Sequence, residues 1–223
     1  MVAIKAYFEY FIKSLLLDKL NLIWSILLPV LTLLVYQNNI YSIETLSFWW
    51  TYMLVNYYVF GVGIFALQLK ESGTLRSIFS FNSNSLIFFL GLLTTQLAYS
   101  FLGMFVFNIA AALLLHFDFL KLFVYSIAQI IICVPVAFIA FAFTKFEKIH
   151  AKTITTVAGI TLFILFILLQ FQSRLIVLNP LYFLSQVLFS TNSAKIYGIF
   201  LIVSLLIGIP SIKNFSCLSN EVR

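Results

Sequence analysis

Six long apolar stretches, separated by short polar breaks, constrain this chain more than any other feature of its sequence. They approach or exceed the roughly 20 residues that an α-helix needs to cross a bilayer core. Of the 223 residues, 63% are hydrophobic and 9% are charged, whereas soluble domains carry about 25% charged residues. One soluble core cannot bury so much apolar surface, so the surrounding solvent must be lipid. A soluble enzyme, a nucleic-acid-binding protein, a disulfide scaffold and a disordered chain are therefore excluded.

The apolar stretches predict an all-α integral membrane protein in which residues 1–223 form a single transmembrane domain. Pro29 lies within the first stretch and Pro135 within the fourth. The third is long enough to tilt or to project beyond the lipid. The six predicted spans cover residues 20–36, 48–69, 86–115, 122–144, 153–171 and 196–212.

Residues 3–19 form the one clearly amphipathic segment. Lys5, Glu9 and Lys13 recur every four residues on one side, opposite a row of large apolar side chains. The segment is too short to cross a bilayer, and its pattern is typical of a helix that lies in the membrane interface. We therefore predict an N-terminal interfacial helix. The alternative is that these residues are only the beginning of the first span.

A second short apolar segment lies between the fifth and sixth spans. Residues 181–189 follow Asn179 and Pro180, and they are too few to span the bilayer and too apolar for a free loop. Proline suits the first turn of a helix, which predicts a helix beginning at Pro180. We expect a re-entrant or interfacial hairpin here. The alternative is a seventh span, which would move the C-terminus to the other side of the membrane.

The basic residues predict the orientation of the chain. With six spans and the N-terminus inside, ten lysines and arginines lie inside and three outside, a strong positive-inside bias. The protein is then expected in the cell membrane, with both termini and the two polar breaks at 70–85 and 145–152 in the cytoplasm. A seventh span would weaken the positive-inside bias. The inner residues are Lys5, Lys13, Lys19, Lys70, Arg76, Lys145, Lys148, Lys152, Lys213 and Arg223, and the outer ones are Lys121, Arg174 and Lys195.

Residues that carry familiar membrane chemistry are missing from the sequence. No Asp, Glu, Lys, Arg or His lies near the centre of a span, which disfavours a secondary transporter driven by protons or sodium. The two histidines and two cysteines form no zinc-ligand pattern, and no phosphate loop, zinc-protease helix or nucleophile elbow is present. The sequence therefore predicts neither a catalytic site nor a metal site in this chain.

Neutral polar residues do occur inside the predicted spans. Either they form hydrogen bonds between helices, or some of them line a permeation path. Neutral polar residues of this kind include Asn56, Gln68, Thr94, Thr95, Gln96, Asn108 and Gln129. The candidate substrate path consists of Asn56, Tyr57, Gln68, Gln96 and Asn108.

The polar break between the second and third spans contains the most informative motif. A charged pair, Lys70 and Glu71, is followed by Ser72, a Gly-Thr-Leu triplet at 73–75 and a short amphipathic stretch. This resembles the first cytoplasmic loop of ABC type-2 exporter permeases, in which a Glu-x-Gly-Thr-Leu segment docks into a partner ATPase. The sequence departs from that family in having no proline after the stretch and no basic residue entering the third span.

The resemblance extends to the whole plan of the chain: an interfacial helix, six spans, cytoplasmic termini and a hairpin before the last span. It implies a glycine at the sharp turn and apolar side chains that fill a groove. It implies ATPase coupling by Glu71, Gly73, Thr74, Leu75, Arg76, Ile78 and Phe79, together with Lys145, Lys148 and Lys152 of the second cytoplasmic loop.

A permease of this kind would pair with a second copy or a sister chain and bind a soluble ATPase. ATP and Mg²⁺ would be held by that ATPase, and this chain would bind no cofactor and no nucleic acid. The expected substrate is amphipathic or hydrophobic: a peptide such as a bacteriocin, a drug or a lipid-like molecule. Two alternatives remain, a non-catalytic membrane scaffold and an ATP-independent channel or carrier.

Overall fold

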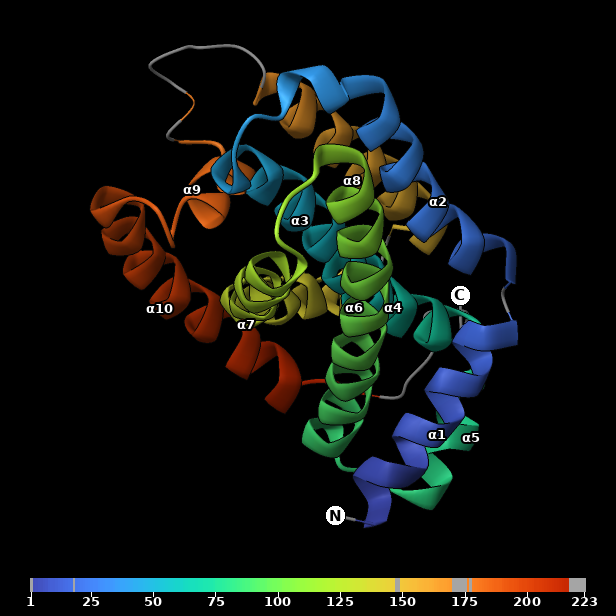
Figure 1. The fold of residues 1–223 in the computed structure, drawn as a ribbon. Helices are drawn as coiled ribbons and strands as arrows, with labels where there is room; N and C mark the ends of the chain where they lie inside the picture. Colours follow the sequence, from blue (N-terminus) through green and yellow to red (C-terminus); the bar gives the residue numbers. More distant parts are fainter. Residues whose placement is uncertain (1, 18, 147–148, 170–175, 177, 217–223) are drawn as a thin grey trace.

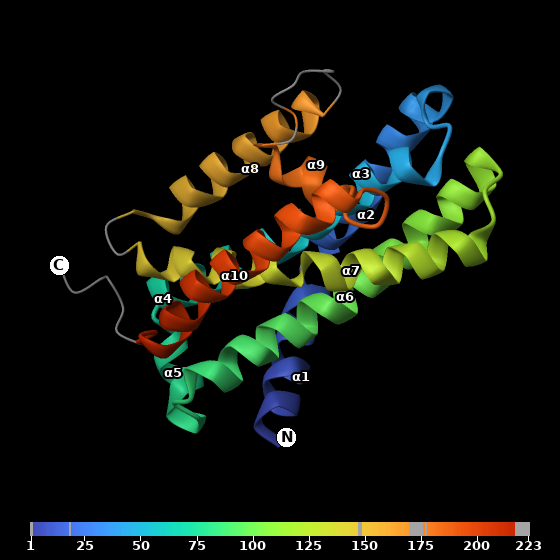
Figure 2. The ribbon, with the colours of Figure 1, turned by 90° about the vertical axis from the view of Figure 1, so that its left-hand side faces the viewer.

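The structure is a computed structural model that describes residues 2–17, 19–146, 149–169, 176 and 178–216. These residues are folded almost entirely into helices and include no strand. The long helices lie side by side and share one general direction, whereas α1 (Val2–Leu17) crosses that direction (Figures 1 and 2).

Within the described part of the chain, five helices are long and apolar enough to cross a membrane. They correspond to the second to sixth predicted spans and confirm the prediction of an all-α protein with several potential membrane spans. The first predicted span coincides with α2 (Lys19–Tyr36), and its crossing of the membrane stays a prediction. The five helices are Ile43–Glu71 (α3, Ile43–Tyr58; η2, Val59–Ile64; α4, Phe65–Glu71), Ser85–Leu115 (α6), Phe119–Lys145 (α7, Phe119–Phe141; η3, Ala142–Lys145), Ala151–Leu168 (α8) and Thr191–Lys213 (α10).

Side-chain caps determine where several helices begin. Each capping oxygen accepts a hydrogen bond from a backbone N–H of the first turn, which has no partner within the helix. The caps are Ser42 for α3, Asn84 for α6, Asp118 for α7 and Asn179 for α9 (Pro180–Ser185). The polar breaks of the sequence therefore supply the start signals of the helices that follow them.

The N-terminal segment forms a helix of its own. Helix α1 changes direction before α2 (Figure 1) and packs against α6, so it is not the beginning of the first span. Tyr7 and Phe11 are buried on its inner side, and the Tyr7 hydroxyl donates a hydrogen bond to the Asn82 carbonyl at 2.7 Å. Its outer side exposes Lys5 and Glu9, whose Nζ and Oε1 atoms are 3.9 Å apart. Its position in the membrane interface stays a prediction.

Helix α9 begins at Pro180, as the sequence predicts. With six residues it is too short to cross a bilayer, which argues against the seventh span. It packs against α3, where the Ser47 hydroxyl donates to the Ser185 carbonyl at 3.1 Å. The re-entrant geometry stays a prediction.

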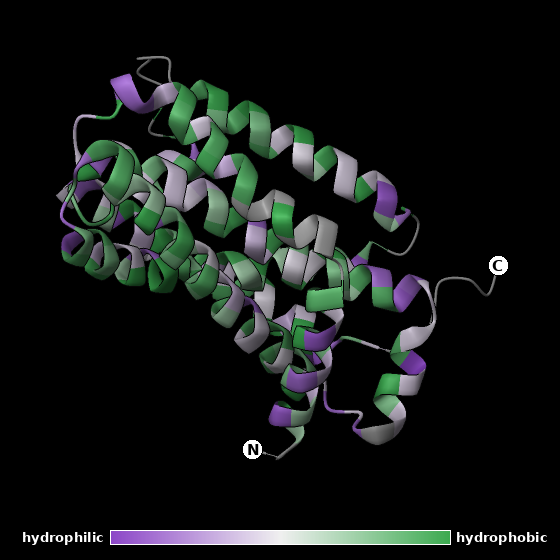
Figure 3. Cartoon of the chain, turned by 45° about the vertical axis from the view of Figure 1, so that its right-hand side comes forward, coloured by the Kyte–Doolittle hydropathy of each residue, from purple (hydrophilic) through white to green (hydrophobic). Residues whose placement is uncertain are grey.

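Polar and apolar residues are separated along the bundle. Hydrophilic residues gather at the two ends of the long helices, and hydrophobic residues dominate between them (Figure 3). The start of α1, the α4–α5 turn, the start of α8 and the end of α10 share one end, where α5 comprises Thr74–Phe81 (Figure 2). By sequence, Lys5 lies in the first turn of α1, Lys70 in α4, Arg76 in α5, Lys145 at the end of η3, Lys152 in the first turn of α8 and Lys213 at the end of α10, whereas Lys121 and Lys195 lie near the starts of α7 and α10.

The helix Ile43–Glu71 is the most enclosed of the five. Within its most apolar window 67% of the residues are buried, against 17% for α8 and 22% for α10. It packs against α6 and α7 along its length and against α9 near its start. It therefore connects the interior of the bundle with the motif-bearing loop at its end.

Candidate functional site

A cavity of about 620 Å³ lies beside the enclosed helix. Helices α1, α2, α6 and α8 contribute to its walls, and the helix Ile43–Glu71 contributes nine residues. It is lined by Phe11, Ser14, Leu15, Leu28, Pro29, Tyr52, Met53, Asn56, Tyr57, Phe60, Gly61, Ile64, Phe65, Gln68, Leu92, Thr95, Gln96, Tyr99 and Thr155. No Asp, Glu, Lys, Arg or His is among these residues.

Four of the five predicted path residues line this cavity, namely Asn56, Tyr57, Gln68 and Gln96. Asn108 lies elsewhere: it is fully buried, and its Oδ1 accepts a hydrogen bond from the Trp50 indole N–H at 2.9 Å. Its Nδ2 donates to the Ser126 hydroxyl at 2.8 Å. The structure therefore brings four of the candidates together and makes the fifth an interhelical contact.

A π-helix, η2, forms the middle of the cavity wall on the enclosed helix. The N–H of Phe65 bonds to the carbonyl of Phe60, five residues earlier. In an α-helix, each step of four residues turns the side-chain direction by about 40°. Tyr52 and Gln68 are four such steps apart, so in a regular α-helix they would face directions about 160° apart. The wider π turn reduces this drift. It thereby allows polar residues from both ends of the helix to line one cavity.

Two glycines let η2 approach its neighbours on opposite sides. A Cβ on Gly61 would lie 2.1–2.4 Å from the terminal atoms of the Gln96 side chain. Gln96 Nε2 donates to the Gly61 carbonyl at 3.4 Å, at the long end of the hydrogen-bond range. A Cβ on Gly63 would lie 2.3 Å from the Ala140 carbonyl oxygen of α7. The π-helix thus packs at Gly63 against the backbone of Ala140, and at Gly61 it faces the flexible side-chain amide of Gln96.

The Glu-x-Gly-Thr-Leu motif lies at the end of the same helix. Gly73 has φ = +73°, a left-handed conformation that suits glycine, and it forms the sharp turn between α4 and α5. Leu75, Ile78 and Phe79 are buried against other helices of this chain. The groove that these three residues fill is therefore the protein's own.

The polar side chains of α5 are more accessible. Arg76, Ser77 and Ser80 are exposed, and Thr74 is half-buried. The Phe79 ring packs edge-on against Phe88, with centroids 5.5 Å apart. A partner that binds α5 would therefore contact its polar side, a difference from the apolar contact expected from the sequence.

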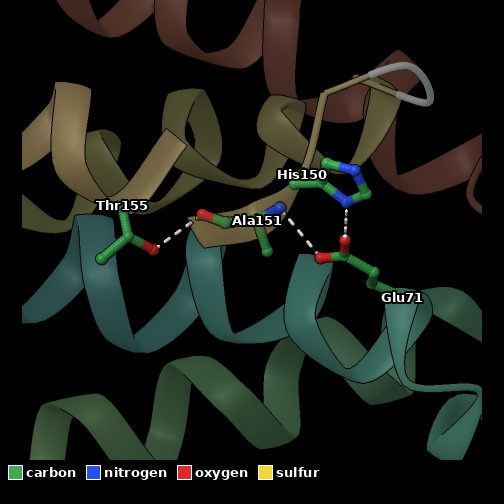
Figure 4. Close-up of polar contacts among 4 residues, drawn as sticks. All are labelled: Glu71, His150, Ala151 and Thr155. Atoms are coloured by element: carbon green, nitrogen blue, oxygen red, sulfur yellow. Dashed lines mark hydrogen bonds and ion pairs between the residues drawn. The ribbon is translucent and has the colours of Figure 1, made fainter. Parts of the chain in front are cut away.

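Glu71 joins the two polar loops at this end of the bundle (Figure 4). Its carboxylate accepts hydrogen bonds from His150 Nδ1 at 2.7 Å and from the Ala151 N–H at 2.8 Å. Ala151 is the first residue of α8, so Glu71 caps a helix 80 residues away, where a negative charge is favourable. One turn later the Thr155 hydroxyl donates to the Ala151 carbonyl at 2.8 Å, and Thr155 lines the cavity.

The predicted lysines of the second loop differ in their surroundings from the lysine of the first. Lys70 is 3% exposed, and its Nζ donates to the Thr144 carbonyl of η3 at 3.2 Å. Lys145 and Lys152 are exposed. Lys148 lies outside the described residues. The buried Lys70 thus adds a second link between the two loops, and Lys145 and Lys152 of the second loop are accessible.

Sequence reasoning missed His150 and the start of α8 as partners of Glu71. Nothing in the sequence pairs residues 80 positions apart, although an unsatisfied helix start beside an acidic loop is a general signal. Among the described residues, no group of three or more His, Cys, Asp or Glu side chains is arranged to bind a metal. No protein-family model, no curated protein and no solved structure matches this chain.

Proposed function

We propose that this chain is the membrane-spanning permease subunit of an ATP-driven exporter of the ABC type-2 class. It moves an uncharged amphipathic or hydrophobic molecule out of the cytoplasm, with a separate soluble ATPase that holds ATP and Mg²⁺. The subunit acts with a second copy or a sister permease, with six spans and both termini in the cytoplasm. The chain itself carries out no catalysis.

One observation carries this proposal: Glu71 of the motif connects two helices that line the cavity. Its own helix, Ile43–Glu71, contributes nine lining residues, and the helix that it caps, α8, contributes Thr155. A displacement of the motif loop by a partner protein is thereby transmitted to two cavity walls at once. Such mechanical coupling between a loop and a buried site is what an ATP-driven exporter requires.

The polar side of α5 provides the surface that the ATPase contacts. Arg76, Ser77 and Ser80 are exposed there, and Lys145 and Lys152 are exposed in and beside the second loop. An ATPase with an acidic or hydrogen-bonding groove matches this surface. Closure of two ATPases around ATP pushes on both loops, and the Glu71 junction makes them move together.

Affinity purification of the tagged chain from its natural host in mild detergent tests the proposal. A soluble protein that contains a phosphate loop and hydrolyses ATP should co-purify in stoichiometric amount. The double variant Arg76→Glu/Ser80→Glu should lose at least about 90% of this ATPase, because it reverses charge on the exposed side of α5. The matched control is Lys121→Glu, a charge reversal at an exposed residue of the opposite end, which should retain it.

Two results would contradict the proposal. The chain could purify without any nucleotide-binding protein, which would favour the scaffold or the ATP-independent channel. Equal loss of the ATPase in the α5 variant and in the Lys121→Glu control would show that the interaction does not involve this end.

A further inference from the structure

We infer that Gly61 and Gln96 form the recognition element of the cavity, and that its ligand is an uncharged, amide-bearing molecule such as an apolar peptide. This inference rests on the proposed function, since it names the substrate class of the same cavity. It combines three features: the absence of charges, the irregular backbone of η2 and the weak contact between Gln96 and Gly61.

The absence of charge excludes ionic ligands. The described lining residues carry amides, hydroxyls and aromatic rings, and none of them is Asp, Glu, Lys, Arg or His. A charged group moved from water into such surroundings without a partner is strongly disfavoured. Hydroxyls and amides can bind neutral polar groups, and the rings of Phe11, Phe60 and Phe65 can pack against apolar ones. An uncharged amphipathic ligand fits both properties.

The irregular backbone marks the position of the polar contact. A π turn widens the helix locally while its backbone N–H groups stay hydrogen-bonded, and π turns in helices are frequent at functional sites. The turn η2 is held by tight packing of Gly63 against Ala140, on the side away from Gln96. On the Gln96 side, the Gly61 carbonyl points its oxygen toward an amide in the cavity wall.

The contact between Gln96 and Gly61 suits replacement by a ligand. At 3.4 Å it is longer than most N–H···O hydrogen bonds, which lie near 2.9–3.0 Å. A ligand N–H can take the place of Gln96 Nε2 on the Gly61 carbonyl, and the released Gln96 amide can then bind the ligand's own carbonyl. A secondary amide supplies this donor and acceptor together, whereas an alkyl chain supplies neither.

Glycine at position 61 is required for this arrangement. A methyl group there would overlap the end of the Gln96 side chain, a flexible group that can move away. Gly61→Ala should therefore fold while it displaces the recognition amide. In the double variant Gly61→Ala/Gln96→Ala, the shortened side chain at position 96 no longer overlaps the new methyl group at position 61. This variant should fold without strain and still lack the Gln96 amide.

Photolabelling of the purified full-length chain in nanodiscs tests the inference. The probe is a seven-residue Leu/Ala peptide with an acetylated N-terminus, an amidated C-terminus and one benzoylphenylalanine. Saturable labelling should fall about fivefold to tenfold in Gln96→Leu, Gly61→Ala and the double variant. Gly198→Ala should label normally, because a Cβ at Gly198 meets no atom within 4 Å.

Two further probes examine the ligand class. Replacing one Ala of the peptide by Lys should reduce labelling at least tenfold, and a benzophenone-bearing fatty alcohol without an amide should not compete with the peptide. Undiminished labelling of Gln96→Leu would overturn the inference, as would stronger labelling by the fatty alcohol than by the peptide. The assay contains no ATPase. A failure of ATPase co-purification with intact labelling would reject the exporter and keep the site, and the reverse result would reject the site alone.

Discussion

The spans contain two groups of neutral polar residues that look alike in sequence and differ in the structure. Asn108 and Gln129 are fully buried and bond to other helices. Asn56, Gln68 and Gln96 line the cavity. In the first group each amide nitrogen has short contacts to a neighbouring element, such as Gln129 Nε2 to the Leu184 carbonyl at 3.0 Å. In the second, Gln96 makes a long contact at 3.4 Å.

The comparison shows that an amide in a membrane span has no fixed role. Where helices close around it, it stabilises the fold, because in lipid an unpaired polar group has no water to bind. Where helices diverge, the same group lines a cavity. The distinction can be tested by placing identical changes in the two groups.

The largest difference is expected when a carboxyl replaces an amide. Gln129→Glu removes the donor to Thr51 and to the Leu184 carbonyl and puts an acid in a sealed site. An uncompensated buried charge costs about 3–5 kcal/mol, so this variant should barely fold. Gln96→Glu lies in a cavity that can hold water, where the acid can stay protonated and form hydrogen bonds, so we expect a smaller loss of about 1–2 kcal/mol.

Thermal unfolding in detergent measures this pair. The midpoint temperature is measured by the circular dichroism of the helices. Reaction of Cys133 with a thiol dye is not used for this pair, because Gln129 itself contacts Cys133. Equal midpoints for the two variants would show that Gln129 is as accessible as Gln96 and would remove the distinction.

The two glycines of η2 extend the comparison to the backbone. Gly63→Ala places a methyl group against the Ala140 carbonyl, which cannot move as a side chain does. Overpacking of this kind costs about 1–3 kcal/mol. The Cys217→Ser change leaves Cys133, which is fully buried, as the one thiol that a dye can report on. In this background, Cys133 should react with the dye at a lower temperature in Gly63→Ala than in the parent protein. Gly198→Ala is the control, and an unchanged midpoint for Gly63→Ala would contradict the close approach.

Much of the fold could be predicted from the sequence because the bilayer makes hydropathy decisive. The five long helices, the cap at Asn84 and the start of α9 at Pro180 all follow from local signals. The motif loop could also be located. Its apolar residues were expected to face a partner, yet Leu75 is fully buried within this chain. A pattern of apolar residues shows that a side is buried and does not show against what.

The cavity could be predicted only in part. Choosing neutral polar residues within spans identified four of its lining residues and also Asn108, which has the same chemistry and a sealed environment. The π-helix decides which residues face together, and a sequence read with a period of 3.6 places Gln68 on a different side from Tyr52. Two glycines in the middle of a span, Gly61 and Gly63, were the available signal.

A smaller loss of stability is expected at Asn108. Asn108→Ala leaves the Trp50 indole N–H without its acceptor and removes the donor to Ser126. Interhelical hydrogen bonds in membranes contribute about 0.6 kcal/mol on average and up to about 1.7. We expect about 1 kcal/mol, measured by the Cys133 reactivity assay. Peptide labelling should not change, and a loss of labelling without a loss of stability would move Asn108 into the cavity group.

The smallest effect on stability is expected at Gln68. Its side chain is exposed at the end of the cavity nearest the motif, on the same helix as Glu71. Gln68→Ala removes no hydrogen bond between described helices of the kind made by Asn108, so the free energy of unfolding should change by less than about 0.5 kcal/mol. Peptide labelling should fall about twofold, since one of several amides is lost. If stability fell instead and labelling stayed the same, Gln68 would belong with the sealed residues, and the cavity would end at η2 rather than continue toward the loop.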